Sequence, residues 1–371
     1  MYFKISKKEF LNKLNIVSKA VSNNSPLPSL HGIKMVVNDD SIELTASDMD
    51  ITIKSVITRN EENNLVINET GELILDSRYI LDMIRKIDSE NVEIELIDGC
   101  AIKISGDSVH FDLNGSKTEN YPLINFDRPE NSFSLSGEAL KNIISQTCFA
   151  ASDKENRPVL MGLNMKCEGG KLTCVATDSY RLAQKVMYLD NVGDFNVTVP
   201  SKNLIEVAKI IDSDKDTTVF VNNKKIVFES EDTVIQTRLI DGTYPETARL
   251  IPSQFSYELI LDSKDLLNAI DRSSFIKNDG VSIVKMQMNE SEVIVSSRSN
   301  EVSSVERIIP INYVGNNLSI SFKGQYVYDA IKAVNAFQIR ILFSGDMKPF
   351  IIKSTENDNI IQLVLPIRTY A

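Results

Sequence analysis

The sequence is poor in the side chains that most active sites need. His31 and His110 are the only histidines in 371 residues, so the commonest general base and metal ligand is nearly absent. The four cysteines lack the C-x-x-C spacing of zinc and redox sites, and we interpret them as buried thiols rather than metal ligands or disulfides. We therefore expect neither a metal site nor a cofactor.

Long apolar runs are also missing. No apolar stretch approaches the roughly 20 residues that a membrane span needs. The chain opens on a strand-like segment, Met1–Ile5, without the charged and then apolar leader of a secreted protein. Charged residues make up 25% and hydrophobic residues 42% of the chain, which is typical of a globular protein. We therefore expect a cytoplasmic protein with no membrane partner.

The formal net charge of −11 has the wrong sign for tight binding to phosphates. The charge is uneven, however, because the six helices predicted below carry a net +5 and leave −16 for the rest of the chain. A weakly basic helical face would suit loose, sequence-independent contact with a polyanion. The simpler alternative is that these lysines and arginines only solvate exposed helix faces.

A short strand leading into an amphipathic helix occurs six times. Apolar residues recur at the spacing of one helix face, as Phe10, Leu14 and Val17 do in the first copy. Ser6 and Glu9 have the S-x-x-E spacing of a capping box, so we expect their side chains to cap this helix. The predicted helices span residues 7–20, 77–88, 137–150, 201–211, 263–276 and 324–336.

Alternating apolar and polar stretches that end in turns follow the first helix of each pair. They include residues 42–48, 172–178 and 293–297. Each unit is therefore β-α-βββ, done twice, and its hairpin-linked strands are antiparallel. The pattern repeats in register about every 125 residues, and prolines mark the breaks between repeats. We predict an α+β protein of three repeated modules, which span residues 1–125, 126–250 and 251–371.

Three short segments are distinctive in combination. They are A-T-D-S-Y-R-L-A at 176–183, D-G-T-Y-P at 241–245 and L-P-I-R-T-Y at 365–370. Together with the three modules they resemble the bacterial sliding clamp, the beta subunit of DNA polymerase III, over the whole chain. The resemblance implies a DNA-clamp fold in which two chains join head to tail into a ring, with antiparallel sheets outside and helices inside. It also implies a non-enzymatic function, in which the ring encircles duplex DNA and tethers the replicative polymerase to make synthesis processive.

The same resemblance implies the partners. Besides double-stranded DNA, held topologically and without sequence preference, they are a second copy of the chain, the clamp loader complex, the DNA polymerase III alpha subunit, other polymerases, and mismatch-repair and ligase proteins. These proteins would insert short linear motifs into an apolar pocket between the second and third modules, and the clamp would be nucleoid-associated. Carried over position by position, the pocket comprises Leu160, Thr177, Ser179, Tyr180, Arg181, Leu182, Pro245, Arg249, Leu250, Tyr326, Met347, Pro349, Leu363, Leu365, Pro366, Ile367 and Arg368. Its apolar side chains would receive the anchors of the motif, while Tyr180 and the arginines would bind polar groups at the rim.

The resemblance also implies residues that face DNA. These are Lys7, Arg78, Lys154, Arg157 and Lys202. The sequence departs from many relatives in two loops, because residues 22–28 contain no arginine and residues 152–159 contain no tyrosine. We therefore do not expect strong DNA contacts of the usual kind from these loops.

The ring interface is the last set of implied residues. We expect Phe111 and Leu113, on an edge strand of the first module, to face Phe275 and Ile276 of the third module of a second chain. An exposed edge strand needs a partner, and closure of the ring would supply one.

Two other functional classes are tested against this interpretation. An enzyme would use carboxylates at turns, such as Asp48, Asp50 and Asp178, but the matching position in the third module is Ser299, and no phosphate loop or nucleophile elbow lies nearby. A scaffold of the same fold that binds only proteins is the second alternative. A plainer interpretation of the pocket is that Leu182 and Leu365 belong to the core and that Asp178 only closes a turn.

Overall fold

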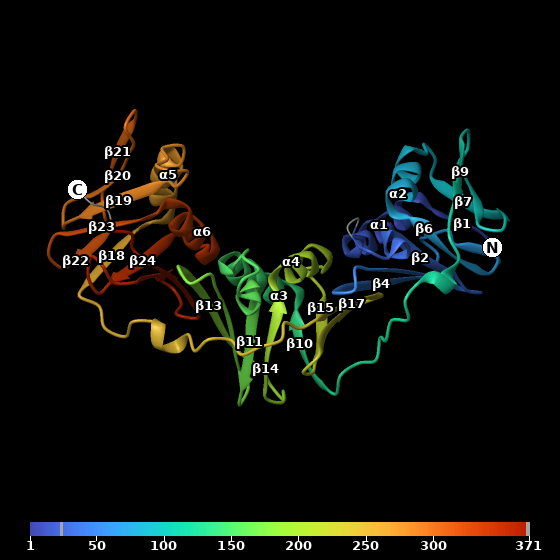
Figure 1. Cartoon of the computed structure of the whole chain (residues 1–371), viewed down its shortest axis with the longest axis horizontal. Helices are drawn as coiled ribbons and strands as arrows, with labels where there is room; N and C mark the ends of the chain where they lie inside the picture. Colours follow the sequence, from blue (N-terminus) through green and yellow to red (C-terminus); the bar gives the residue numbers. More distant parts are fainter. Residues whose placement is uncertain (23–24, 369–371) are drawn as a thin grey trace. The chain divides into compact units, whose positions relative to one another are not determined.

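The computed structural model describes residues 1–22 and 25–368, and Figure 1 traces its elements. Each predicted helix is present and begins at its predicted residue. The helices are α1 (Lys7–Val17), α2 (Ser77–Lys86), α3 (Gly137–Thr147), α4 (Ser201–Ile210), α5 (Ser263–Ser273) and α6 (Gly324–Val334). They end one to three residues before their predicted ends, partly because the chain after α1 and α3 tightens into a 3-10 turn. None of the helices in these ranges is long and apolar enough to cross a membrane.

Helix capping follows the sequence only in part. The predicted apolar face of α1 is confirmed, since Phe10, Leu14 and Val17 are buried. The predicted capping box is wrong, because the Ser6 side chain makes no capping hydrogen bond, and Glu9 instead pairs with Lys13 one turn further on, at 3.9 Å. Helix α2 is capped by a carboxylate of the residue directly before it.

That carboxylate belongs to Asp76, which accepts hydrogen bonds from the backbone N–H groups of Arg78 at 3.0 Å and Tyr79 at 3.3 Å. These are two of the amides that the first turn of a helix leaves without intrahelical partners.

The chain divides into two compact units, and the first comprises residues 1–138 and 206–239. It contains two antiparallel sheets. The five-stranded sheet has the order β5 (Val66–Glu69), β1 (Tyr2–Ser6), β7 (Asn91–Asp98), β8 (Ala101–Ser105) and β9 (His110–Asn114). The eight-stranded sheet has the order β10 (Asn131–Ser136), β15 (Asp216–Val221), β16 (Lys225–Ser230), β17 (Thr233–Arg238), β4 (Ile51–Thr58), β3 (Ser41–Ser47), β2 (Gly32–Val37) and β6 (Gly71–Asp76). Helix α1 packs on β3, β4 and α2.

The second unit comprises residues 139–205 and 240–371 and has the same organisation. Its nine-stranded sheet has the order β14 (Phe195–Pro200), β11 (Gly162–Glu168), β12 (Lys171–Thr177), β13 (Arg181–Tyr188), β26 (Ile360–Val364), β25 (Phe350–Ser354), β24 (Gln338–Phe343), β18 (Tyr257–Asp262) and β22 (Asn312–Val314). Its four-stranded sheet has the order β21 (Ser303–Ile308), β20 (Val293–Arg298), β19 (Ile283–Met288) and β23 (Leu318–Lys323). Helix α6 packs on β25, β26 and α5.

In each unit one sheet crosses a predicted module boundary. Strand β4 pairs with β17 in the first unit, and β13 pairs with β26 in the second, both antiparallel. Leu182 of β13 lies opposite Leu363 of β26. Each junction therefore closes by main-chain hydrogen bonding between strands that are more than 170 residues apart in the sequence.

Buried aromatic and aliphatic side chains fill both units. Phe3 and Phe10 meet edge to face at 5.8 Å in the first unit, and Phe350 lies 5.2 Å from Phe343 in the second. The prediction of buried thiols is confirmed for three of the four cysteines, while Cys100 is half-buried.

Candidate partner-binding site

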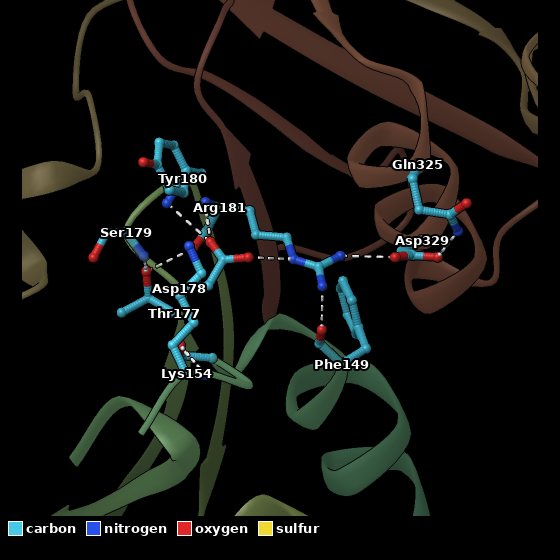
Figure 2. Close-up of polar contacts among 10 residues, drawn as sticks. Phe149, Lys154, Thr177, Asp178, Ser179, Tyr180, Arg181, Gln325 and Asp329 are labelled. Atoms are coloured by element: carbon cyan, nitrogen blue, oxygen red, sulfur yellow. Dashed lines mark hydrogen bonds and ion pairs between the residues drawn. The ribbon is translucent and has the colours of Figure 1, made fainter. Parts of the chain in front are cut away.

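The turn between β12 and β13 carries the most distinctive motif of the sequence. Thr177 Oγ1 accepts the N–H of Ser179 at 3.1 Å, and Asp178 Oδ1 accepts the N–H groups of Tyr180 at 2.9 Å and Arg181 at 3.0 Å. Ser179 adopts the left-handed region with φ 77°. These bonds, drawn in Figure 2, fix the backbone of the turn. The Tyr180 side chain is 58% exposed.

The same turn occurs in the first module. Asp48 Oδ1 accepts the N–H groups of Asp50 at 2.9 Å and Ile51 at 2.8 Å, and Met49 has φ 81°. The predicted match in the third module is also confirmed, because Ser299 Oγ accepts the N–H of Val302 at 3.1 Å. Carboxylate and hydroxyl oxygens are interchangeable here because each only has to accept backbone hydrogen bonds. Asp48 and Asp178 are therefore turn-closing residues, and the enzyme alternative loses its acid–base groups.

The guanidinium of Arg181 is the centre of the polar network (Figure 2). Its Nε donates to Asp178 Oδ2 at 3.1 Å, its Nη1 to Asp329 Oδ2 at 2.7 Å, and its Nη2 to the Phe149 carbonyl at 2.6 Å. The rings of Phe149 and Tyr326 lie 5.2 and 4.6 Å from the guanidinium carbon. All three nitrogens are thus engaged inside the protein, so Arg181 holds the walls of the site together.

The surroundings of Tyr326 disfavour the ionised form of its phenol. Partial burial, followed by the nearby carboxylate of Asp178, raises the pKa of its phenol above the ordinary value. The Tyr326 ring lies against the Arg181 guanidinium and lines the cavity beside it.

A cavity of about 320 Å³ lies beside this turn. Its lining residues are Ser152, Asp153, Lys154, Asn156, Arg157, Leu160, Asp178, Ser179, Tyr180 and Tyr326. Four of the predicted pocket residues, Leu160, Ser179, Tyr180 and Tyr326, are therefore brought together. Lys154 and Arg157, which the sequence assigns to DNA, line the same cavity, and Arg157 Nη1 lies 3.5 Å from Ser179 Oγ.

An apolar cluster accounts for three more predicted residues. Leu182 and Leu363 are 2% and 3% exposed, and they pack with Val175, while half-buried Leu365 packs against the cluster. The plainer interpretation is thus right for Leu182, which is core, but Leu365 keeps part of its surface exposed.

The segment after β26 is tied to the site through its backbone. Leu365 N–H donates to the Tyr180 carbonyl at 3.0 Å, and Ile367 N–H donates to the Ser321 carbonyl at 2.7 Å. The last two residues of the predicted L-P-I-R-T-Y motif, 369 and 370, lie outside the described residues.

The other predicted pocket residues do not line the 320 Å³ cavity. Leu250 and Met347 are 54% and 45% exposed, on the linker before β18 and on the β24–β25 turn. Buried Thr177 lies within the turn itself. Exposed Pro245, Arg249 and Arg368 and half-buried Pro349, Pro366 and Ile367 complete the set.

Neither Phe149 nor Asp329 was predicted from the sequence as part of this site. Their roles depend on contacts with a residue 32 or 148 positions away, and neither belongs to a distinctive motif.

Three predicted DNA-facing residues lie on or beside helices, in different surroundings. Lys7 Nζ donates to the carbonyl of Arg85 at 3.2 Å and to that of Ile87, so its charge complements the C-terminal end of α2. Arg78 pairs with Asp76 at 3.3 Å. Lys202 is exposed on α4 and is the least constrained of the three.

The predicted dimer residues differ in exposure. Phe111 and Leu113 lie on β9, which is an edge of the five-stranded sheet, but Leu113 is 8% exposed and Phe111 is half-buried. Phe275 is 67% exposed just after α5, whereas its neighbour Ile276 is 2% exposed. Ile276 therefore lies inside the fold, whereas Phe275 is an exposed apolar side chain.

The comparisons with known proteins agree with this architecture. Family models of the DNA polymerase III beta subunit match in order, the N-terminal domain over residues 1–125, the central domain over 134–246 and the C-terminal domain over 248–368. The Bacillus subtilis beta sliding clamp is 36% identical over 378 residues, which cover 100% of both chains.

Solved structures give the same result. The chain resembles the crystal structure of the Bacillus subtilis clamp with a TM-score of 0.95 and 35% identity over 100% of both chains. The DNA polymerase III beta chain of Streptococcus pneumoniae gives a TM-score of 0.94 at 31% identity, over 99% of this chain and 100% of that one. The predicted α+β clamp fold and the resemblance noted in the sequence are confirmed. The chain belongs to the bacterial sliding clamps, the beta subunits of DNA polymerase III.

Proposed function

We propose that this chain, a non-enzymatic sliding clamp, receives its protein partners on the surface around Tyr180. The observation that carries the proposal is a large aromatic side chain, 58% exposed, on a turn whose backbone is fixed by Thr177 and Asp178. A rigid, exposed aromatic side chain beside a cavity is an efficient anchor, because little conformational entropy is lost when a peptide packs on it.

A short linear motif would contact this surface in two ways. Its apolar side chains would cover the exposed parts of Leu250, Met347 and Leu365, and its polar groups would meet Arg157 and Arg368 at the rim. The clamp loader, the polymerase III alpha subunit, other polymerases, and mismatch-repair and ligase proteins would then compete for one surface.

Substitution of Tyr180 tests this proposal. Tyr180→Ala should weaken binding of the polymerase alpha subunit by about tenfold or more, the usual loss for an aromatic hot spot. Tyr188→Ala is the matched control, because Tyr188 is 78% exposed at the far end of β13. Surface plasmon resonance on the two variants decides, and normal affinity of Tyr180→Ala would reject the site.

Ring closure joins two sheet edges in our proposal. Phe111 and Leu113 lie on edge strand β9, and β21 is the edge of the four-stranded sheet, with Val305 67% exposed on it. Phe275 is exposed near α5 and would add apolar area to the contact with the second chain. Light scattering should give twice the 41.5 kDa chain mass for the native protein and a lower mass for Phe275→Asp. A dimer unchanged by this substitution would exclude Phe275 from the interface.

Retention on DNA depends on the closed ring rather than on tight phosphate contacts. Lys202 and Arg78 are the exposed candidates on helices, and Lys154, Arg157 and Lys7 are the weaker ones. A clamp loaded onto nicked circular DNA should stay bound through gel filtration and should leave when the DNA is linearised. Binding that ignores DNA ends would instead support the protein-only scaffold.

We also propose boundaries for the three modules and a location in the cell. We place the three modules at residues 1–125, 126–250 and 251–371, and we place the protein in the cytoplasm with the nucleoid. Limited proteolysis that cuts first between residues 121 and 130 or between 244 and 255 would support these boundaries, because linkers are cleaved before folded modules.

A further inference from the structure

The first unit contains a groove beside the turn that repeats the Tyr180 turn. The strand pairing β4–β17 and the turn at Asp48 and Met49 reproduce the pairing β13–β26 and the turn at Asp178 and Ser179. A cavity of about 430 Å³ lies beside this turn, between residues 122–129 and the β16–β17 pair. We call it the junction groove and define it by Met49, Leu123, Lys224 and Arg238, which all line it.

The wall formed by residues 122–129 is suited to an extended ligand. This segment forms neither helix nor strand, and the backbone groups of Leu123 and Ile124 make no hydrogen bond within the described ranges. Ile124 packs on the buried side chains of Leu30, Ile74 and Tyr121, which anchors the segment. Leu123 is consequently held fully exposed, an arrangement that costs solvation free energy unless something covers it.

The opposite wall carries more positive than negative charge, with Asp127 close enough to act on the Lys225 ammonium. Lys225 and Arg238 lie directly opposite each other in the β16–β17 register, and Lys224 is adjacent. Lys225 donates to the Asn125 carbonyl at 2.9 Å and to Gln236 Oε1 at 3.1 Å, both neutral acceptors. The side chains of Lys224 and Arg238 form no ion pair or hydrogen bond with any residue in 1–22 or 25–368. Like charges that face each other across a sheet are unfavourable, and an anion beside Lys224 and Arg238 would reduce that cost.

We propose that the junction groove binds an extended peptide that places one large apolar side chain on Leu123 and Met49 and one carboxylate beside Lys224 and Arg238. The exposed apolar side chains of Leu123 and Met49 and the nearby carboxylates of Asp50 and Asp127 disfavour a nucleic acid backbone, which needs a uniformly basic surface. The junction groove is separate from the Tyr180 surface and differs from it chemically. Ile51 occupies the position that Arg181 has in the other turn, so the first unit has no counterpart of the Arg181–Asp329 ion pair at this position.

Photocrosslinking to the full-length protein tests the proposal. The probe is a pool of six-residue peptides, each with one benzoylphenylalanine and one glutamate at varied spacing, and the control pool has lysine in place of glutamate. Trypsin releases the groove wall as residues 118–141 and the Tyr180 turn as residues 172–181, so each site is read separately by mass spectrometry. We expect the glutamate pool to label 118–141 at least several times more than the lysine pool does.

Two sets of variants complete the design. K224E with R238E should lower labelling of 118–141 about tenfold, since two exposed attractions become repulsions, while K264E with K277E, two exposed lysines of the second unit, should leave it unchanged. Leu123→Ser should also lower it without affecting folding, because Leu123 is exposed.

The outcomes separate the groove from the Tyr180 surface. Absence of label on 118–141, label that survives charge reversal, or label that duplex DNA removes would each overturn the proposal. Loss of label on 172–181 alone would count against the Tyr180 surface and not against the junction groove.

Discussion

Arg181 Nη1 donates a hydrogen bond to Asp329 Oδ2 at 2.7 Å, although the two residues are 148 positions apart in the sequence. The pair ties the turn after β12 to helix α6 and sets Tyr326 over the guanidinium at 4.6 Å. Both side chains are mostly buried, at 14% and 26% exposed, so solvent screens the pair only in part. The ion pair between Arg181 and Asp329 therefore holds the exposed turn at Tyr180 against helix α6.

Replacement of Asp329 should weaken the attachment of the Tyr180 turn to α6. Asp329→Asn removes the charge but keeps the size, so we expect a loss of about 1–2 kcal/mol in the free energy of unfolding, and weaker binding of partners. Urea denaturation followed by circular dichroism measures the first effect. The control is Asp358→Asn, which breaks the pair between 79% exposed Asp358 and Lys353 and should cost less. Equal changes in the free energy of unfolding for the two variants would mean that the Arg181–Asp329 pair is no more stabilising than the Lys353–Asp358 pair.

A second ion pair, with its lysine buried, lies in the first unit. The side chain of Lys13 on α1 is 9% exposed, and its ammonium contacts Asp232, 41% exposed on the β16–β17 turn, with Glu9 at 3.9 Å. Asp232→Asn should cost about 2–3 kcal/mol because it leaves a buried charge poorly paired, whereas Lys13→Met should cost less because it removes the charge and keeps the packing. Thermal melts of the two variants give the order, and the reverse order would show that the charge itself is stabilising.

The thiols make a prediction about alkaline pH. Burial raises the pKa of Cys148 from its ordinary 9.0 to about 12. Between these values the unfolded thiol has ionised and the folded one has not, so the unfolded state binds fewer protons and stability falls as pH rises. The stabilisation that comes from keeping the Cys148 thiol protonated is therefore present below pH 9. By pH 10 the free energy of unfolding should have fallen by about 1.4 kcal/mol on its account.

The pH dependence of urea unfolding checks this value. Between pH 8 and 10 the native protein should lose more stability than Cys148→Ala, which has no thiol at this position to ionise. Parallel curves would contradict the raised pKa. In the folded protein at pH 8, iodoacetamide should alkylate half-buried Cys100 before the three buried thiols.

Local periodicity predicted the elements well, and the reason is physical. A helix that must bury one face repeats its apolar residues every three or four positions, so α1 could be read from Phe10, Leu14 and Val17. The equivalence of Asp48, Asp178 and Ser299 was predictable too, because a turn closed by a side-chain oxygen depends only on its neighbours in the sequence.

Contacts between distant residues could not be read in the same way. Nothing near Lys7 indicates that its ammonium binds the end of α2, and nothing near Lys154 places it in the Tyr180 cavity. The capping box failed because the Ser6 side chain makes no hydrogen bond to the helix amides, whereas Asp76, which precedes α2 in the same way, does. The family resemblance supplied the list of pocket residues, but only the structure separates buried Leu182 and Leu363 from exposed Tyr180.

The segment after β26 gives the last prediction. Leu365 N–H donates to the Tyr180 carbonyl at 3.0 Å, and Ile367 N–H donates to the Ser321 carbonyl at 2.7 Å, so the segment fixes the Tyr180 turn besides offering Leu365 as apolar surface. A chain that ends after Val364 should lose binding to the polymerase alpha subunit. It should remain dimeric, because neither β9 nor β21 touches this segment through a backbone hydrogen bond.

A chain that ends after Arg368 is the matched control, since it keeps both hydrogen bonds, and it should bind normally. Light scattering reports the dimer and surface plasmon resonance reports the partner. If the shorter chain binds the polymerase as well as the longer one, the segment is not part of the partner site. If it becomes monomeric, the segment acts on the ring, and the Tyr180 surface must then be judged from the Tyr180→Ala variant alone.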